Sequence, residues 1–117
     1  MKNHVKYFCV TPFSFYDLTI RELSPTGYER LSVAEVRVPP GAAHPKARSI
    51  KSDKLYVCIE GTITFQLNGE SLQLNPLDVL LIPRAEWFSY RNDVSEEGKL
   101  LLVHTPPFDM AREEIVS

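Results

Sequence analysis

The chain has 117 residues, of which 44% are hydrophobic and 24% are charged, and its net charge at pH 7 is −2. These values are typical of a single globular domain, and they exclude the basic face that nucleic-acid-binding proteins need. No apolar run approaches the roughly 20 residues of a membrane span, and residues 1–7 lack the apolar core of a secretion signal. We therefore expect one cytoplasmic domain over residues 1–117, with neither a nucleic-acid nor a membrane partner.

The N-terminal third predicts two strands joined by a turn. Residues 17–23 and 31–38 are short and rich in β-branched side chains, and Ser24-Pro25-Thr26-Gly27 lies between them. The aromatic residues 13–16 should be held by packing, as an edge strand or an interface surface. Two cysteines, Cys9 and Cys58, are too few for a disulfide framework, so we expect reduced thiols that pack.

The middle of the chain predicts a loop followed by a hairpin. Residues 42–53 are polar, which predicts a loop. Residues 54–60 and 62–68 alternate apolar and polar side chains, the pattern of a strand with one buried face. Asn68-Gly69 predicts a type I′ turn because both residues tolerate positive φ, and residues 71–74 form the returning strand.

The last third predicts three more strands. Residues 77–82 are nearly all apolar, as in a strand buried on both faces, and Pro83 ends that run. Residues 87–91 and 99–105 predict two further strands, and residues 110–116 predict one or two helical turns. Short strands with regular turns between them indicate a sandwich or barrel of roughly eight to ten strands.

The stretch from Gly41 to Asn92 resembles the two consecutive motifs of the cupin superfamily. The first motif is Gly, five residues, His-x-His, three or four residues, Glu, six residues and Gly; the second ends in Pro-x-Gly, two residues, His, three residues and Asn. Gly41, Gly61, Pro83 and Asn92 match without a gap. The resemblance covers about residues 31–105 and implies an all-β fold, a single small jelly-roll β-barrel.

The positions of the family's metal ligands are all substituted. They hold Ala47, Ser49, Lys54 and Phe88. Alanine and phenylalanine have no metal-binding atom, and the ammonium of Lys54 would repel a divalent ion. Losing even one outer-shell partner typically costs about 10–100-fold in metal affinity, so we expect no metal and no other cofactor.

The resemblance implies that these four positions face the barrel interior. Alternation then turns Tyr56 and Cys58 inward with Lys54, and Tyr90 inward with Phe88. His104 shares its strand face with Leu100 and Leu102. The expected ligand-binding residues are Ser49, Lys54, Tyr56, Phe88, Tyr90 and His104.

Lys54 has two interpretations. One is a fixed cation that holds an anionic group of the ligand, because an unpaired ammonium in an apolar interior is unfavourable. The other is a lysine that reaches the barrel mouth or pairs with Glu60, Glu86 or Asp78. His44, beside Pro45, is either a displaced ligand, or a residue at the barrel mouth that contacts a substrate, or a solvated loop residue, and we expect the last of these.

The sequence is compatible with three functions. The first is a metal-free protein that binds a small anionic or carbohydrate-derived molecule. The second is a metal-independent sugar isomerase or epimerase, as some cupin relatives are, with His104 or His44 as the base and Tyr56 or Tyr90 as the acid. The third is a metalloenzyme with ligands relocated to His44, His104 and a carboxylate, which the spacing does not favour. We also expect a homodimer, because exposed sheet edges invite pairing.

Overall fold

The computed structural model describes residues 3–116, which form strands and two short 3-10 helices. The helices are η1 (Tyr7–Cys9) and η2 (Met110–Arg112). The strands are β1 (Phe13–Phe15), β2 (Leu18–Glu22), β3 (Ser32–Val38), β4 (Ala43–Ser49), β5 (Asp53–Glu60), β6 (Ile63–Leu67), β7 (Glu70–Leu74), β8 (Val79–Ile82), β9 (Phe88–Arg91), β10 (Gly98–Thr105) and β11 (Glu113–Val116). No helix in this part of the chain has the length and apolar character to cross a membrane.

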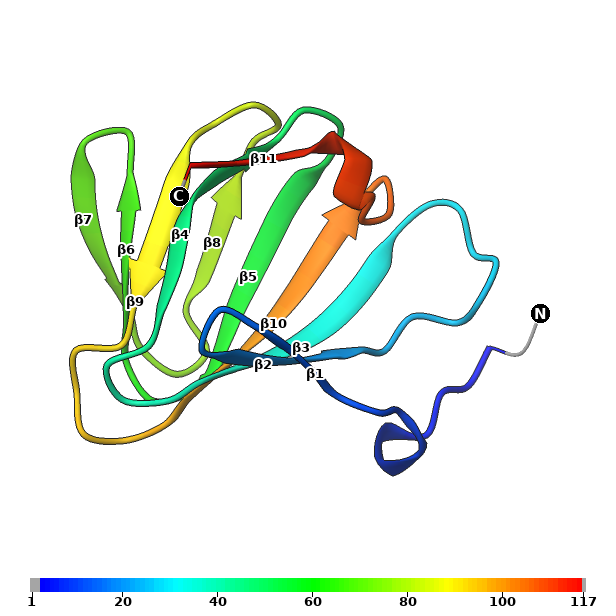
Figure 1. Cartoon of the computed structure of the whole chain (residues 1–117), viewed down its shortest axis with the longest axis horizontal. Coiled ribbons are helices and arrows are strands. Elements are labelled where there is room, and N and C mark those ends of the chain that lie inside the picture. Colours follow the sequence, from blue (N-terminus) through cyan, green and yellow to red (C-terminus); the bar gives the residue numbers. More distant parts are fainter. Residues whose placement is uncertain (1–2, 117) are drawn as a thin grey trace.

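The strands form two antiparallel sheets that face each other (Figure 1). One sheet has the order β1-β2-β3-β10-β5-β8, and the other has the order β11-β4-β9-β6-β7. Neighbours in both sheets are far apart in sequence, since β10 lies between β3 and β5, and β4 lies between β11 and β9. This is a jelly roll, so the all-β fold expected from the sequence is confirmed.

The core fills the space between the two sheets. Tyr56, Phe65 and Leu100 are each no more than 1% exposed. Alternate residues of β5 and β10 are buried, which confirms the inward direction predicted for the Lys54 and His104 faces. Cys58 is a buried free thiol, whereas Cys9 is exposed, so the packing expected of Cys9 is wrong.

Two of the matched motif residues serve the backbone. Gly61 has a φ of +78°, and a Cβ there would lie 2.9 Å from the carbonyl oxygen of Glu97. The buried Asn92 amide donates to the carbonyl oxygens of Val38 at 2.9 Å and Glu96 at 2.7 Å. Gly61 and Asn92 therefore stabilise the loops between strands, through backbone conformation and hydrogen bonds.

Three segments differ from their predicted structure. Residues 42–53, predicted as a loop, contain β4, which pairs with both β9 and β11. Residues 77–82 were predicted to be buried on both faces, but β8 is an edge strand in which Val79 is 58% and Leu81 is 57% exposed. Residues 110–116 form one 3-10 turn and then β11, because their backbone completes the edge of β4.

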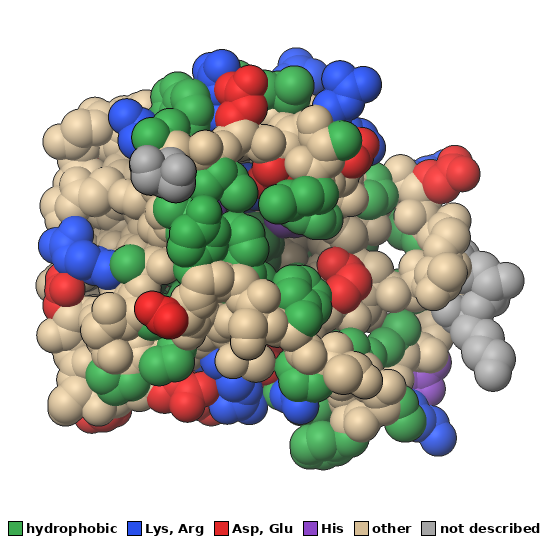
Figure 2. Space-filling view, in the orientation of Figure 1, with side chains coloured by type: hydrophobic (Ala, Val, Ile, Leu, Met, Phe, Trp, Pro, Cys, Tyr) green, Lys and Arg blue, Asp and Glu red, His purple; other side chains and the backbone are tan. Residues whose placement is uncertain are grey.

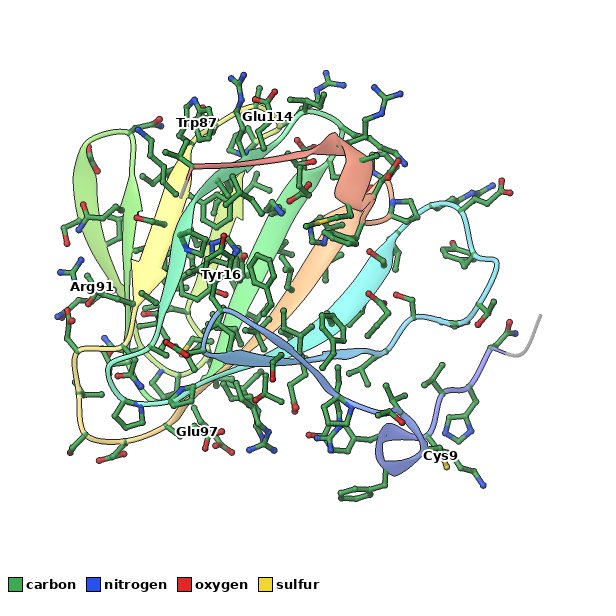
Figure 3. All side chains as sticks on the ribbon, in the orientation of Figure 1. Cys9, Tyr16, Trp87, Arg91, Glu97 and Glu114 are labelled. Atoms are coloured by element: carbon green, nitrogen blue, oxygen red, sulfur yellow. The ribbon has the colours of Figure 1, made fainter. Side chains whose placement is uncertain are left out.

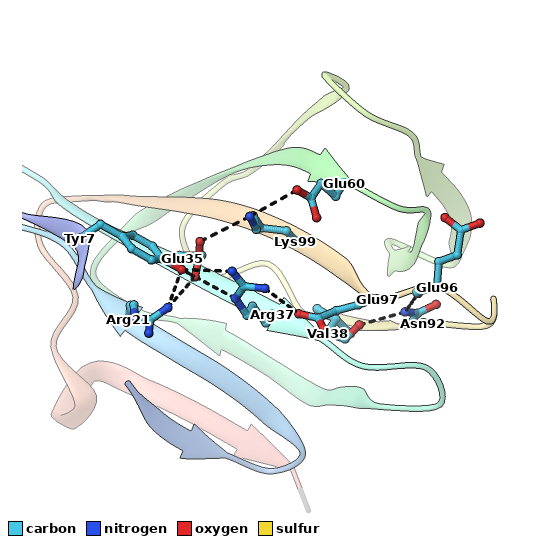
Figure 4. Close-up of polar contacts among 10 residues, drawn as sticks. All are labelled: Tyr7, Arg21, Glu35, Arg37, Val38, Glu60, Asn92, Glu96, Glu97 and Lys99. Atoms are coloured by element: carbon cyan, nitrogen blue, oxygen red, sulfur yellow. Dashed lines mark hydrogen bonds and ion pairs between the residues drawn. The ribbon is translucent and has the colours of Figure 1, made fainter. Parts of the chain in front are cut away.

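An ionic cluster fixes the N-terminal segment to the outer face of the first sheet (Figure 4). The carboxylate of Glu35, on β3, accepts a hydrogen bond from the Tyr7 hydroxyl at 2.6 Å and lies 3.3 Å from Nε of Arg37. Arg21 lies 3.7 Å away, and its guanidinium packs over the Tyr7 ring. This cluster keeps Glu35 buried on a sheet face that is otherwise solvent-facing.

Candidate functional site

A cavity of about 300 Å³ lies between the inner faces of the two sheets. Figure 2 shows hydrophobic side chains gathered around a hollow on one face of the molecule, with a histidine visible inside it. Its apolar walls include Phe15, Val36 and Leu102, and the C-terminal segment contributes Phe108 and Met110. The polar residues of the lining are Glu22, His44, Lys54, Tyr56, Tyr90, His104 and Glu113.

A wider and more open groove of about 680 Å³ runs along the outside of β9. Trp87 lies there, with the Arg48 guanidinium 4.6 Å from its ring centroid. Arg48 also pairs with Glu114 at 2.6 Å, and Figure 3 shows Trp87 and Glu114 along the same edge of the molecule. The cavity between the sheets is less open to solvent than this groove and is lined by more ionisable side chains, so it is the better site for chemistry.

Three buried polar side chains meet at one end of the cavity. The ammonium of Lys54 donates to Oε1 of Glu113 at 2.6 Å and lies 2.8 Å from Nε2 of His104. Lys54 and His104 are register partners on β5 and β10, whereas Glu113 comes from β11 in the other sheet. The side chains of Lys54 and Glu113 are only 4% and 7% exposed.

The partner predicted for Lys54 was wrong. Glu60, Glu86 and Asp78 were the alternatives, and the structure places Glu113 there instead. Residues 110–116 carried no strand signal, so their carboxylates were not expected to point inward. The missing counter-charge that suggested an anionic ligand is therefore supplied by the chain itself.

Burial shifts the pKa values of Lys54 and His104. Burial lowers the pKa of Lys54, and the adjacent Glu113 carboxylate opposes that shift. Burial, with a smaller effect from Lys54, lowers the pKa of His104 to about 3. His104 is thus neutral near pH 7, and its Nε2 can accept a hydrogen bond from the Lys54 ammonium.

His44 lies in β4 and lines the cavity, so its interpretation as a solvated loop residue is wrong. Its Nδ1 is 2.7 Å from the carbonyl oxygen of Pro45, which requires the proton to be on Nδ1. Its ring lies 5.1 Å from that of Phe88 and 5.0 Å from that of Tyr90. Burial lowers the pKa of His44 to about 4, so Nε2 carries a free lone pair at neutral pH.

Tyr56 and Tyr90 complete the other side of the cavity. Their ring centroids lie 5.5 Å apart, and both side chains are almost fully buried. Burial raises the pKa of Tyr56 well above its ordinary value, with a further contribution from Tyr90, and burial also raises the pKa of Tyr90. Both phenols are therefore protonated donors throughout the physiological range.

The structure brings four of the six predicted ligand-binding residues to the cavity: Lys54, Tyr56, Tyr90 and His104. Ser49 and Phe88 are buried but are not part of its lining. The Ser49 hydroxyl accepts from the backbone N–H of Ser52 at 2.9 Å, and Phe88 packs behind His44. Sequence reasoning missed Glu113; the alternation of Glu113 and Ile115 was the available signal for an inward-facing strand.

The residues at the family's metal positions do not fit a metal ion. Ala47 and Phe88 have no donor atom, the Ser49 hydroxyl holds a turn, and the Lys54 ammonium is bound to Glu113. Within residues 3–116, no three His, Cys, Asp or Glu side chains gather as a metal-ion ligand set. A relocated site on His44 and His104 would also have to displace Lys54 from His104.

Comparison with known proteins gives a family and several structural neighbours. The cupin domain model matches residues 34–104. None of the curated protein sequences is similar enough to the chain to count as a match.

Three solved structures share the fold over nearly the whole chain. Pac13 from Streptomyces, described as a nucleoside dehydratase, has a TM-score of 0.87 at 18% identity, covering 99% of this chain and 92% of that chain. The polyketide cyclase RemF from Streptomyces resistomycificus has a TM-score of 0.84 at 20% identity, covering 100% and 87%. KdgF from Halomonas sp. has a TM-score of 0.83 at 14% identity, covering 93% and 97%. Pac13 variants with one histidine changed to glutamine, or one of two tyrosines changed to phenylalanine, are known with uridine.

Proposed function

The chain belongs to the cupin family, and we propose that it is a metal-independent enzyme that eliminates water from an uncharged, hydroxylated small molecule such as a nucleoside. The observation that carries this proposal is the convergence of a neutral histidine, His44, and two protonated tyrosines, Tyr56 and Tyr90, on one cavity. The cavity volume of about 300 Å³ is at the small end of the range for ligand sites.

The step is a proton abstraction coupled to loss of hydroxide. Nε2 of His44 takes a proton from a carbon of the substrate, and the electron pair of that C–H bond forms a new C=C bond. The neighbouring C–O bond breaks, and a tyrosine hydroxyl donates a proton to the departing hydroxide, which leaves as water. Acid–base assistance of this kind typically contributes about 10²–10⁴-fold in rate.

The low pKa of His44 restricts which proton it can remove. With a pKa of about 4, the imidazole is a weaker base than in solution. An imidazole of either pKa removes a carbon-bound proton only where a neighbouring group, such as a carbonyl, stabilises the negative charge that develops on the carbon. We accordingly infer a substrate that carries a carbonyl group next to the carbon that loses its proton.

The structural neighbours support this assignment. Pac13 is described as a nucleoside dehydratase. The histidine and two tyrosines changed in its variants occur in the same order, and at nearly the same spacing, as His44, Tyr56 and Tyr90.

The test is an elimination assay by mass spectrometry. Wild-type protein is incubated with nucleosides whose sugar carries a carbonyl group, and loss of one water from the substrate is the expected result. His44→Gln and Tyr90→Phe should abolish elimination while keeping the fold. If the protein binds these molecules but never eliminates water, it is a small-molecule-binding cupin without catalysis, the first of the functions considered from sequence.

A further inference from the structure

The second carboxylate oxygen of Glu113 has no hydrogen-bond partner within the part of the chain that the structure describes. Oε2 is buried, the side chain is only 7% exposed, and Glu113 lines the cavity. A buried carboxylate oxygen without a donor is unfavourable, and its cost is larger than for a neutral group. Because Glu113 lines the cavity, a ligand bound in the cavity can supply that donor.

The residues around Glu113 define what kind of donor fits. The Lys54 ammonium already makes two hydrogen bonds, to Oε1 of Glu113 and to Nε2 of His104. An ammonium has three N–H bonds, so one is left over for a ligand, with the Phe88 ring centroid 5.5 Å from Nζ. The site thus offers the ligand an acceptor, Oε2 of Glu113, and a donor, the ammonium of Lys54. The ion pair that these two side chains form has no net charge.

The position of Glu113 is fixed by the sheet. β11 pairs with β4, so that Glu113 is opposite Ser49 and Ile115 is opposite Ala47. The neighbouring Glu114 points away and pairs with Arg48 at 2.6 Å. The backbone of Glu113 is therefore positioned by a strand, as expected of a residue in a binding site.

We propose that Glu113 and Lys54 form a recognition subsite for an uncharged ligand group that places a hydrogen-bond donor beside an acceptor. In a nucleoside, this group is the N–H and C=O edge of the base or a pair of neighbouring ribose hydroxyls. His44, Tyr56 and Tyr90 then act on another part of the same molecule. This inference rests on the proposed function for its choice of probe, and it replaces the anionic ligand expected from the sequence.

Isothermal titration with uridine tests the subsite without turnover. Glu113→Gln keeps the side-chain size but replaces one acceptor oxygen by a donor, and it should weaken binding by about tenfold or more. Glu114→Gln changes the adjacent, solvent-facing carboxylate of the same strand and should bind uridine like wild type. Equal affinity in Glu113→Gln and wild type would overturn the proposal, as would the absence of uridine binding to wild type at millimolar concentration.

Modified probes identify which part of the nucleoside Glu113 contacts. N3-methyluridine lacks the base N–H, and 2′,3′-dideoxyuridine lacks the ribose hydroxyl pair. The probe that lacks the contacted group should bind wild type at least about tenfold more weakly than uridine does. Glu113→Gln and wild type should then bind that probe with equal affinity, because the contact is already lost. If Glu113→Gln weakens both probes as much as it weakens uridine, Glu113 contacts neither group and the subsite assignment is wrong. Uridine 5′-phosphate should bind no more tightly than uridine, and a large gain from the phosphate would restore the anionic ligand.

A double variant separates recognition from folding. Lys54→Met with Glu113→Leu removes both buried charges together, so the fold should keep its thermal midpoint while uridine binding is lost. Retained uridine binding in this variant contradicts the subsite. If uridine binds through Glu113 but nucleosides whose sugar carries a carbonyl group lose no water, the proposed function is wrong and the subsite stays in place.

Discussion

The ammonium of Lys54 lies 2.6 Å from Oε1 of Glu113, although 59 residues separate them in the chain. The contact joins β5 of one sheet to β11 of the other, and both residues line the cavity. Lys54 occupies the position at which cupin relatives carry a metal-binding glutamate. This position therefore carries the cation of a buried ion pair in this chain.

We predict that Lys54→Met destabilises the protein by about 3–5 kcal/mol, because it leaves the Glu113 carboxylate buried without its counter-ion. Urea denaturation at pH 7 measures the loss. The double change to Lys54→Met and Glu113→Leu should recover most of it, since no buried charge then remains. A single variant as stable as wild type would show that the ion pair contributes little to folding.

We also predict that the free energy of unfolding falls as the pH is lowered from about 6.5 towards 4. The folded-state pKa of His44 is about 4 and that of His104 about 3, both below the ordinary value of 6.5. The unfolded chain therefore binds more protons in this window, and each histidine lowers stability by up to about 1.4 kcal/mol per pH unit. Urea titrations at several pH values measure the slope.

The control for this pH dependence is the pair of single variants His44→Gln and His104→Gln. Each should flatten the slope between pH 4 and pH 6.5, because one proton fewer is taken up on unfolding. An unchanged slope in both variants would show that carboxylates, and not these histidines, govern acid stability.

Much of the site was predictable from the sequence, because strand alternation fixes which side chains share a face. The cupin resemblance placed Lys54 inward, alternation then placed Tyr56 and His104, and all three are buried. The hydrophobic pattern failed at His44, because β4 is rich in polar residues and its register with β9 shifts between His44 and Ala47, which breaks the alternation expected of a strand. It also failed at Glu113, because β11 is a strand only through its pairing with β4, more than 60 residues away in the sequence.

We expect the purified protein to contain no stoichiometric zinc, iron, manganese or nickel. The reason is the donor set at the family positions: Ala47 and Phe88 cannot bind a metal, and Lys54 carries a positive charge. Elemental analysis of protein purified without chelator measures the content. About one metal ion per chain that resists mild chelation would contradict this expectation.

The last prediction concerns association of the chain with itself. We propose a homodimer, because β8 leaves an edge of the larger sheet open and exposes apolar side chains beside it. Val79 and Leu81 are more than half exposed, and Leu77 is 79% exposed. Leu81→Lys places a charge on this edge and should shift the mass measured by light scattering from dimer to monomer at micromolar concentration. Ser71→Lys, on the exposed edge strand β7 of the other sheet, is the matched control and should leave the mass unchanged. A monomer mass for wild type would contradict the proposed dimer, and a shift with Ser71→Lys alone would place the interface on the smaller sheet.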